Sequence, residues 1–417
     1  RCRLVVDVGD SSLGYGSGMI DEAKKRVDVV VDRLADRLVE VSRSIHAHPE
    51  LNFEEHHAHD LLTSVLEQNG HQVTRHAYGV DTAFECCVGD RGPEILVLLE
   101  YDALPGIGHG CHNVIAAAGL GAGLAAAELA GEVGGRVRIL GTPAEEGGGG
   151  KIHMARNGAF RSGDAAMMIH PADADLLRMH SIAIHTLDVV YHGRAAHAAA
   201  APWEGRNALD AAVLGYMNIA SLRQHIRPTE RVHGIITEGG EKANIVPRRS
   251  AANWYVRSDT METLQPLKSR VLDCLEGATR ACGCSMDVTW DDVAYADVRD
   301  NRAMVSAFVA NMATLGRDVR DPDAIGRRVT GSTDMGNVSY LLPSIHPMIK
   351  VAPDGVAIHT EEFARHAGSE AGDEASIVGA KAMARTIVDL WGNTALLDEV
   401  RREFSAVTSS VDVMARP

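Results

Sequence analysis

The sequence predicts an α/β protein in which a small α+β domain is inserted into a larger α/β domain. Its 417 residues are too many for one ordinary hydrophobic core. Helical and strand patterns alternate along the N-terminal part of the chain and resume near its C-terminus, which is typical of a layered domain with a mostly parallel sheet. The pattern changes in between. We therefore predict the larger domain at 19–181 and 297–417, the inserted domain at 182–296, and a non-native or disordered extension at 1–18.

The larger domain is predicted to begin with an amphipathic helix over 20–45. Val30, Leu34, Leu38 and Val41 recur there at helical spacing, and Pro49 ends the helix. The remaining elements expected in this domain are helices at 54–69, 113–130 and 370–391, and strands at 72–76, 82–88, 95–99, 136–140, 349–351 and at the end of 158–170.

The inserted domain shows the order strand, helix, strand, strand, helix, strand. Two helices on one face of a four-stranded sheet form a ferredoxin-like module. The expected strands are 185–191, 232–238, 250–256 and 286–290, and the expected helices are 208–225 and 262–281.

Composition and charge exclude several classes of partner. The chain is 45% hydrophobic and 23% charged, which is typical of a soluble globular protein. A net charge of −15 disfavours nucleic acid and anionic membranes, because both require a basic surface. No apolar run approaches the roughly 20 residues of a membrane span. Seven cysteines, an odd number in a long chain, argue against a disulfide framework.

The first residues do not resemble a targeting segment. Residues 1–18 lack the basic start and apolar core of a signal peptide. Met19 opens a helical pattern, so we take it as the natural start and expect a cytoplasmic protein.

The stretch 100–113 follows the apolar strand at 95–99 and contains two carboxylates, two imidazoles and a thiol. Polar groups at the end of a core strand are costly to bury unless something pairs with them. A metal ion is the simplest partner, since Cys and His are preferred ligands of zinc-like cations. A structural cysteine beside a surface histidine is the alternative.

Two adjacent carboxylates, Glu145 and Glu146, follow the next strand. One could bind a metal while the other acts as a general base on water. A phosphate-binding loop is excluded, because Glu145 stands where its first glycine is required and Ile152 replaces Ser or Thr. An acidic surface turn would not need the glycines that follow. Another glycine cluster, at 119–123, lies inside a predicted helix and indicates close packing on the sheet rather than dinucleotide binding.

His170 and His359 also follow apolar strands. A lone histidine at a strand end is more often structural than a ligand. Here both occur at the same topological place as the Cys/His and Glu/Glu pairs, and this convergence favours ligands.

In these motifs taken together, the chain resembles the M20 family of metallopeptidases and amidohydrolases. Within the family it resembles the branch of aminoacylases, aminobenzoyl-glutamate hydrolases and M20-domain-containing dipeptidases. The resemblance extends over about residues 20–392 in the order of the family's motifs. The matching segments are 45–51, 100–109, 143–148, 193–199, 243–247, 331–334 and 358–363.

The resemblance implies a zinc-peptidase-like catalytic domain with two divalent metal ions, Zn or Mn, with Co or Ni as further options. Glu145 would be the base that deprotonates the water held by the metals, and the ferredoxin-like insert would be a lid that forms a homodimer. His197 would reach across from the partner subunit to stabilise the oxyanion, and Asn244, Arg257 and Gly331 would contact the substrate. For His197, Asn244 and Arg257 a surface or cap role is the alternative. The implied metal ligands are Cys111, His112, Glu146, His170 and His359.

The chain departs from the family at one of these ligand positions. The family pattern is Cys-Gly-His-Asn, whereas Cys111, His112 and Asn113 are consecutive here. Adjacent side chains of an extended chain point to opposite sides. Three explanations stay open: the loop bends, His109 replaces one ligand, or the metal site is impaired.

The predicted function is the metal-dependent hydrolysis of an amide bond next to a free carboxylate. Candidate substrates are N-acyl amino acids, dipeptides and aminobenzoyl-glutamate-like compounds. One rival is a non-catalytic binding or regulatory protein that lost its metal with the missing glycine. Another is a mononuclear hydrolase that uses Glu146, His170 and a single loop ligand.

Overall fold

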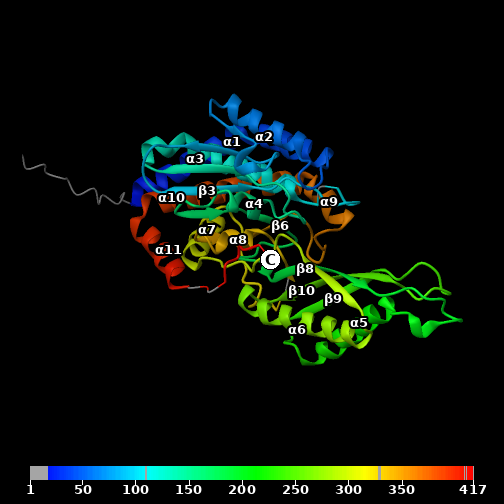
Figure 1. Ribbon diagram of the computed structural model, residues 1–417. Helices are drawn as coiled ribbons and strands as arrows, with labels where there is room; N and C mark the ends of the chain where they lie inside the picture. The colour runs from blue at the N-terminus through cyan, green and yellow to red at the C-terminus, as the bar shows by residue number, and fades with distance from the viewer. Residues whose placement is uncertain (1–16, 109, 327–329, 408, 410, 417) are drawn as a thin grey trace, which may run out of the picture.

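The computed structural model describes residues 17–108, 110–326, 330–407, 409 and 411–416. Figure 1 shows two bodies: a large one with helices on both faces of a sheet, and a smaller one built from a second sheet and two helices. Most of the predicted extension at 1–18 lies outside the described residues, and the first helix, α1 (Ser17–Ala47), begins within its last two residues.

The large sheet has six strands in the order β1-β2-β4-β3-β5-β13. The strands β4, β3, β5 and β13 are parallel, whereas β2 is antiparallel to both β1 and β4. The carboxyl ends of β3, β4 and β5 therefore meet at one edge, where α/β sheets bind ligands. The strands are β1 (Thr74–Arg75), β2 (Phe84–Val88), β3 (Glu94–Leu99), β4 (Arg136–Gly141), β5 (Ala165–Met167) and β13 (Ser344–Ile345).

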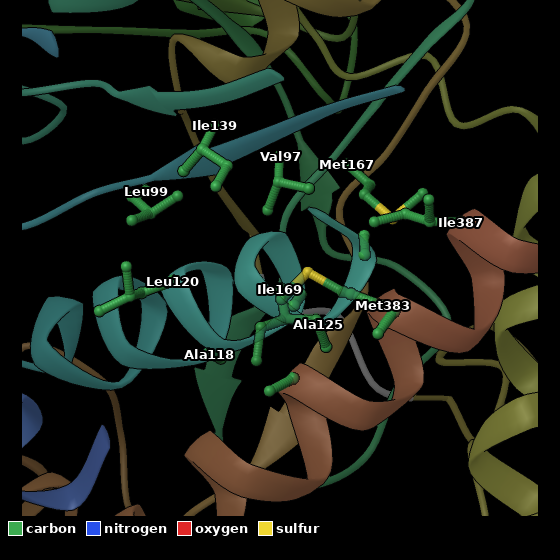
Figure 2. Packing of buried hydrophobic residues seen from close by; sticks show 14 of the residues in the cluster. Val97, Leu99, Ala118, Leu120, Ala125, Ile139, Met167, Ile169, Met383 and Ile387 are labelled. Carbon is green, nitrogen blue, oxygen red and sulfur yellow. The ribbon is translucent and has the colours of Figure 1, made fainter. Parts of the chain in front are cut away.

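Helices cover both faces of this sheet. Val97 and Leu99 of β3 point towards α3 (His112–Val133), which packs between the sheet and α10 (Glu370–Gly392), as Figure 2 shows. Leu96 and Leu98 point to the other face and pack with α4 (Gly150–Arg156) and α8 (Met335–Ser339). All residues of β3 are buried, which explains the continuous apolar run in the sequence.

The glycines of α3 permit this close packing. A Cβ atom at Gly123 would lie 2.5 Å from Ile139 Cδ1 on β4, and one at Gly121 would lie 2.6 Å from Leu38 Cδ1 on α1. The helix-packing interpretation of the glycine cluster is therefore confirmed. The expectation of no span-length apolar segment was wrong for α3, which is long and apolar enough to cross a membrane, but 89% of its most apolar window is buried inside the protein.

The smaller body contains a four-stranded antiparallel sheet in the order β11-β8-β10-β9. Its two helices pack on one face of the sheet, on the side away from the larger body (Figure 1). This order and connectivity are those of a ferredoxin-like module. The elements are β8 (Ala183–His192), α5 (Ala208–Leu222), β9 (Arg231–Glu238), β10 (Arg249–Ser258), α6 (Met261–Ala281) and β11 (Ser285–Trp290).

Several elements were not anticipated from the sequence. The helix predicted at 370–391 is not the last, because Asn393 caps a further helix by accepting from Leu396 N–H at 3.1 Å. Every cysteine of the described residues is free. Two further elements, α2 (His56–Gln68) and β14 (Met348–Lys350), agree with the helix predicted at 54–69 and the strand predicted at 349–351. The remaining elements are η1 (Ala77–Gly79), β6 (His170–Ala172), β7 (His180–Ser181), η2 (Pro202–Glu204), η3 (Arg223–His225), α7 (Arg302–Thr314), β12 (Thr330–Gly331), α9 (Glu361–Ala367) and α11 (Thr394–Ala406).

Candidate metal centre and active site

The loops that follow β3, β4 and β5 bring four of the five predicted metal ligands together at the carboxyl edge of the large sheet, and His359 joins them from the segment between β14 and α9. Cys111 and His112 lie where the loop after β3 enters α3, and His170 is the first residue of β6. One ligand atom from each of these three buried residues lies within 4.8 Å of the others. Nitrogen and sulfur donors at this spacing suit a zinc-like cation.

The loop bends at Cys111, as the first of the three explanations for the missing glycine requires. Cys111 precedes the first residue of α3 with φ −172° and ψ −1°, so it is not part of an extended pair with His112. Its Sγ lies 4.0 Å from His170 Nε2. Adjacent residues can therefore both face the same site. His109, the alternative ligand, lies outside the described residues.

Asp102 orients the imidazole of His112. Its Oδ1 lies 3.0 Å from His112 Nδ1, and its Oδ2 accepts the Glu146 N–H at 2.9 Å. His112 Nε2 is buried and has no hydrogen-bond partner within the part of the chain that the structure describes. Burial alone would lower the pKa of His112, but Asp102, Glu146 and Glu100 raise it above its usual range. A carboxylate on the far nitrogen of an imidazole is the usual support of a metal-bound histidine.

The second imidazole, that of His170, has a different hydrogen-bond partner and a different pKa shift. Its Nδ1 donates to the Pro171 carbonyl at 2.8 Å, so Nε2 carries the free lone pair. Burial lowers the pKa of His170 to about 4, which keeps the ring neutral at pH 7. Burial and the nearby Glu146 raise the pKa of the Cys111 thiol, so a bound cation would be needed to stabilise its thiolate.

The two adjacent glutamates have different surroundings. Glu146 Oε1 lies 3.6 Å from His112 Nε2 and 3.4 Å from His359 Nε2. Burial opposes its charge, but the hydrogen bond from His359 lowers the pKa of Glu146. Burial, Glu100 and Glu146 together raise the pKa of Glu145 well above its usual value. Neighbouring carboxyls with pKa values pushed apart are a mark of different chemical roles.

The centre holds more buried acid than its own cations can balance. Lys151 and His112 are the only basic groups recorded in contact with its carboxylates apart from the exposed His359, within the described part of the chain. Burying uncompensated charge is strongly unfavourable. The donor atoms and this charge imbalance fit divalent cations. The acidic residues concerned are the buried Glu100, Asp102, Glu145 and Asp334, and the partly buried Glu146.

Sequence reasoning missed the supporting network around these ligands. Lys151 is fully buried and binds Glu100 and Asp334 through its ammonium at 2.6 and 2.7 Å. Glu55 accepts the N–H of Ala144 at 2.9 Å, and thus holds the residue before Glu145 at its positive φ of 58°. The only sequence signal was the presence of Lys151 in the rejected phosphate-loop pattern.

A cavity of about 420 Å³ extends from the two glutamates to the exposed face of the small sheet. Among the predicted substrate-binding residues, Arg257 and Gly331 line it. Arg257 Nε is buried without a hydrogen-bond partner, and burial lowers the pKa of its guanidinium. Within the described residues no carboxylate pairs with this guanidinium, so it is suited to receive one from a ligand.

His197 and Asn244 are not among the residues that line this cavity. They lie together elsewhere on the small domain, where Ala198 N–H donates to the Asn244 carbonyl at 3.0 Å. His197 is exposed. Their predicted roles require a second subunit and stay predictions.

Comparisons with known proteins assign the chain to a family. A profile of peptidase family M20/M25/M40 matches residues 97–389. The chain belongs to this family. It is 42% identical to a mouse Xaa-Arg dipeptidase over 91% of this chain and 92% of that protein. It is 28% identical to one of the p-aminobenzoyl-glutamate hydrolase polypeptides of Escherichia coli over 94% of this chain and 96% of that polypeptide. The M20 chain is therefore a hydrolase of amide bonds, as the sequence motifs predicted.

Solved structures agree with the fold. A putative aminohydrolase from methicillin-resistant Staphylococcus aureus superposes with a TM-score of 0.75 at 17% identity, over 88% of this chain and 99% of that one. A dinuclear metal-binding M20 peptidase of Bacillus subtilis superposes with a TM-score of 0.66 at 19% identity, over 86% and 99%. The predicted α/β fold class is confirmed.

Proposed function

We propose that this M20 chain is a metal-dependent dipeptidase that cleaves the amide bond next to a C-terminal basic residue. The observation that carries the proposal is the cavity. It is lined by the Glu145–Glu146 pair, by the exposed Asp291, and by Arg257, which has no carboxylate partner among the described residues. The relatives named Xaa-Arg dipeptidase, from mouse and human, are 42% and 38% identical to the chain.

Cys111, His112, Glu146, His170 and His359 would hold two divalent ions, as their spacing and charge allow. Such ions would polarise the scissile carbonyl and lower the pKa of water. Glu145 would take a proton from the attacking water and deliver it to the leaving amine. The substrate carboxylate would bind Arg257, which fixes the amide bond in front of Glu145.

Asp291 favours a basic side chain at the C-terminal position of the substrate. Its backbone is fixed on both sides, since its N–H donates to Thr186 O at 3.0 Å and its carbonyl accepts from His185 Nε2 at 2.8 Å. Its carboxylate is exposed and has no recorded cationic partner among the described residues. Thr186 faces Tyr255 across the sheet, two residues from Arg257. One sheet face thus offers a cation for the substrate carboxylate and an anion for a basic side chain.

Aminobenzoyl-glutamate is the second candidate substrate, because a hydrolase of this compound is 28% identical over nearly the whole chain. Its side-chain carboxylate would approach the carboxylate of Asp291. Like charges in a partly desolvated cavity repel, so we place this substrate behind the basic dipeptides.

The test compares Ala-Arg, Ala-Lys, Ala-Ala and p-aminobenzoyl-glutamate with wild-type enzyme and with Asp291→Asn. We expect the wild-type enzyme to prefer the basic dipeptides. The substitution should lower kcat/KM for them by about 10- to 100-fold, the effect of losing one charged hydrogen bond, and leave Ala-Ala nearly unchanged.

Asp292→Asn is the matched control for this experiment. Asp292 is the next residue and is also exposed, but its carboxylate pairs with Arg156 and does not line the cavity. Equal cleavage of basic and neutral dipeptides by the wild-type enzyme would contradict the proposed specificity, as would equal effects of the two substitutions.

The proposed enzyme acts as a homodimer through the small domain. The strand β9 is at the edge of its sheet, and an exposed edge with apolar side chains is a ready surface for a second chain. Large apolar side chains are exposed on β9 and on α5, namely Val213, Leu214, Tyr216, Met217, Ile235 and Ile236. In such a dimer His197 would donate a hydrogen bond to the oxyanion in the partner's site.

Mixed dimers test both the dimer and the crossing of His197. Chains carrying His197→Ala and chains carrying Glu145→Gln are each expected to be nearly inactive alone. A purified mixed dimer should recover about half of the wild-type activity, because one of its two sites combines an intact Glu145 with the partner's intact histidine. No recovery, or an active monomer in sedimentation, would refute the arrangement.

A further inference from the structure

We propose that Glu100 is an additional metal ligand of this centre, fixed in place by Lys151. Glu100 is the first residue after β3 and is completely buried. The inference rests on the proposed function, because it concerns the metal centre of the same site. The sequence places Glu100 among the polar groups of the stretch 100–113, but the resemblance does not include it among the implied metal ligands.

The two oxygens of the Glu100 carboxylate have different surroundings. Oε1 accepts a hydrogen bond from Lys151 Nζ at 2.6 Å. Oε2 is buried and has no hydrogen-bond partner among the described residues. It lies 3.8 Å from His112 Nε2, which is also buried and without a partner. A buried carboxylate oxygen without a hydrogen bond is costly, and a cation bound beside it would remove that cost.

The spacing of these atoms suits a shared ion. Ligand bonds of about 2.0–2.2 Å allow two donors of one ion to be separated by up to about 4.4 Å. The separation of 3.8 Å between Glu100 Oε2 and His112 Nε2 is within this limit. A ligand atom of Glu145 lies within 4.8 Å of both residues. His112 also belongs to the group with Cys111 and His170. Because Asp102 occupies its Nδ1, the free Nε2 can bind an ion at one of these two positions only. Glu100 would serve the position away from Cys111.

Asp334 explains why the charge of Glu100 is available for a metal. Both Asp334 oxygens bind Lys151, with Oδ1 2.7 Å from Nζ and Oδ2 2.9 Å from the backbone N. One carboxylate therefore already balances the buried ammonium. The Lys151 ammonium then fixes the rotamer of Glu100, while the negative charge of Glu100 remains to be balanced by another cation.

The test measures bound metal rather than turnover. Wild-type protein, Glu100→Gln and Asp334→Asn are loaded with Mn²⁺ or Zn²⁺, dialysed against low free metal and analysed for metal per chain. Both substitutions remove one buried negative charge beside Lys151, but only Glu100→Gln removes the free oxygen. We expect about two ions per chain for wild-type protein and Asp334→Asn, and about one for Glu100→Gln.

Cobalt substitution provides a check on folding. A Co²⁺–thiolate bond absorbs in the near ultraviolet. This absorption therefore measures whether the ion position next to Cys111 is occupied. Glu100→Gln should keep this absorption while its total cobalt content falls. That result would show that the variant is folded and has lost one position only.

Three results would overturn the proposal: two ions of wild-type affinity in Glu100→Gln, equal losses in the two variants, or fewer than two ions in the wild-type protein. Failure of the proposed function would look different. In that case the metal contents would follow the expected pattern, and none of the dipeptides would be hydrolysed.

Discussion

Glu145→Gln should reduce kcat by about 10²- to 10⁴-fold, the usual contribution of a general base. The glutamine has nearly the same shape, so the buried loop after β4 should keep its structure, but it cannot accept the proton of the attacking water. Glu145 is suited to this role because burial and its neighbours Glu100 and Glu146 raise its pKa. Steady-state kinetics on Ala-Arg would measure the effect.

Metal analysis of the same variant decides what a loss of activity means. We expect Glu145→Gln to retain its metal, since the predicted ligands are other residues. Glu362→Gln is the control, because Glu362 is an exposed carboxylate near His359 in the sequence and its loss should have little effect. Normal turnover of metal-loaded Glu145→Gln would refute the assignment. A wild-type protein that binds no metal would instead support a binding or regulatory role.

Lys151→Met should destabilise the protein by about 3–5 kcal/mol, the typical cost of removing one partner from a buried ion pair. The substitution leaves the carboxyls of Glu100 and Asp334 in the interior without their ammonium. Burial raises the pKa of both carboxyls, so each must take up a proton or remain charged and unpaired. Urea unfolding in the presence of a chelator measures the loss without compensation by metal.

Lys350→Met is the matched control for this stability experiment. Lys350 also pairs with a carboxylate, Asp354, at 2.6 Å, but both side chains are largely exposed, and such pairs contribute about 0–1 kcal/mol. Adding Glu100→Gln and Asp334→Asn to Lys151→Met should recover part of the stability, because the buried set is then neutral. A loss below about 1 kcal/mol for Lys151→Met would contradict a buried ion pair of this kind.

The sequence predicted the fold and the gathering of polar groups at strand ends from local patterns, whereas the full set of candidate ligands came from the resemblance to the M20 family. Glu146 and His170 follow apolar strands, and parallel strands bring their carboxyl ends to one edge. Lys151 could not be placed in the same way. Its helix starts after Gly149, a residue with φ 65°, inside a stretch that resembled a loop. Its partners are 51 and 183 residues away, and no periodicity marks a contact at such a separation.

The orientation of Cys111 could not be predicted from the sequence for the same reason. The sequence alone left three explanations for the missing residue between Cys111 and His112. The bend that joins them depends on where α3 begins, and helix boundaries are determined by backbone geometry that a motif does not encode.

The packing of α3 has a consequence for the metal centre. His112 is the first residue of this helix, and Gly121 and Gly123, less than four turns further on, fit against α1 and β4 with no room for a methyl group. The candidate ligand His112 is thus attached to a helix that packs tightly against its neighbours at these glycines. The position of His112 is therefore fixed by the packing of the hydrophobic core rather than by a surface loop. A core packed at this density deforms little, so the candidate metal centre should be rigid.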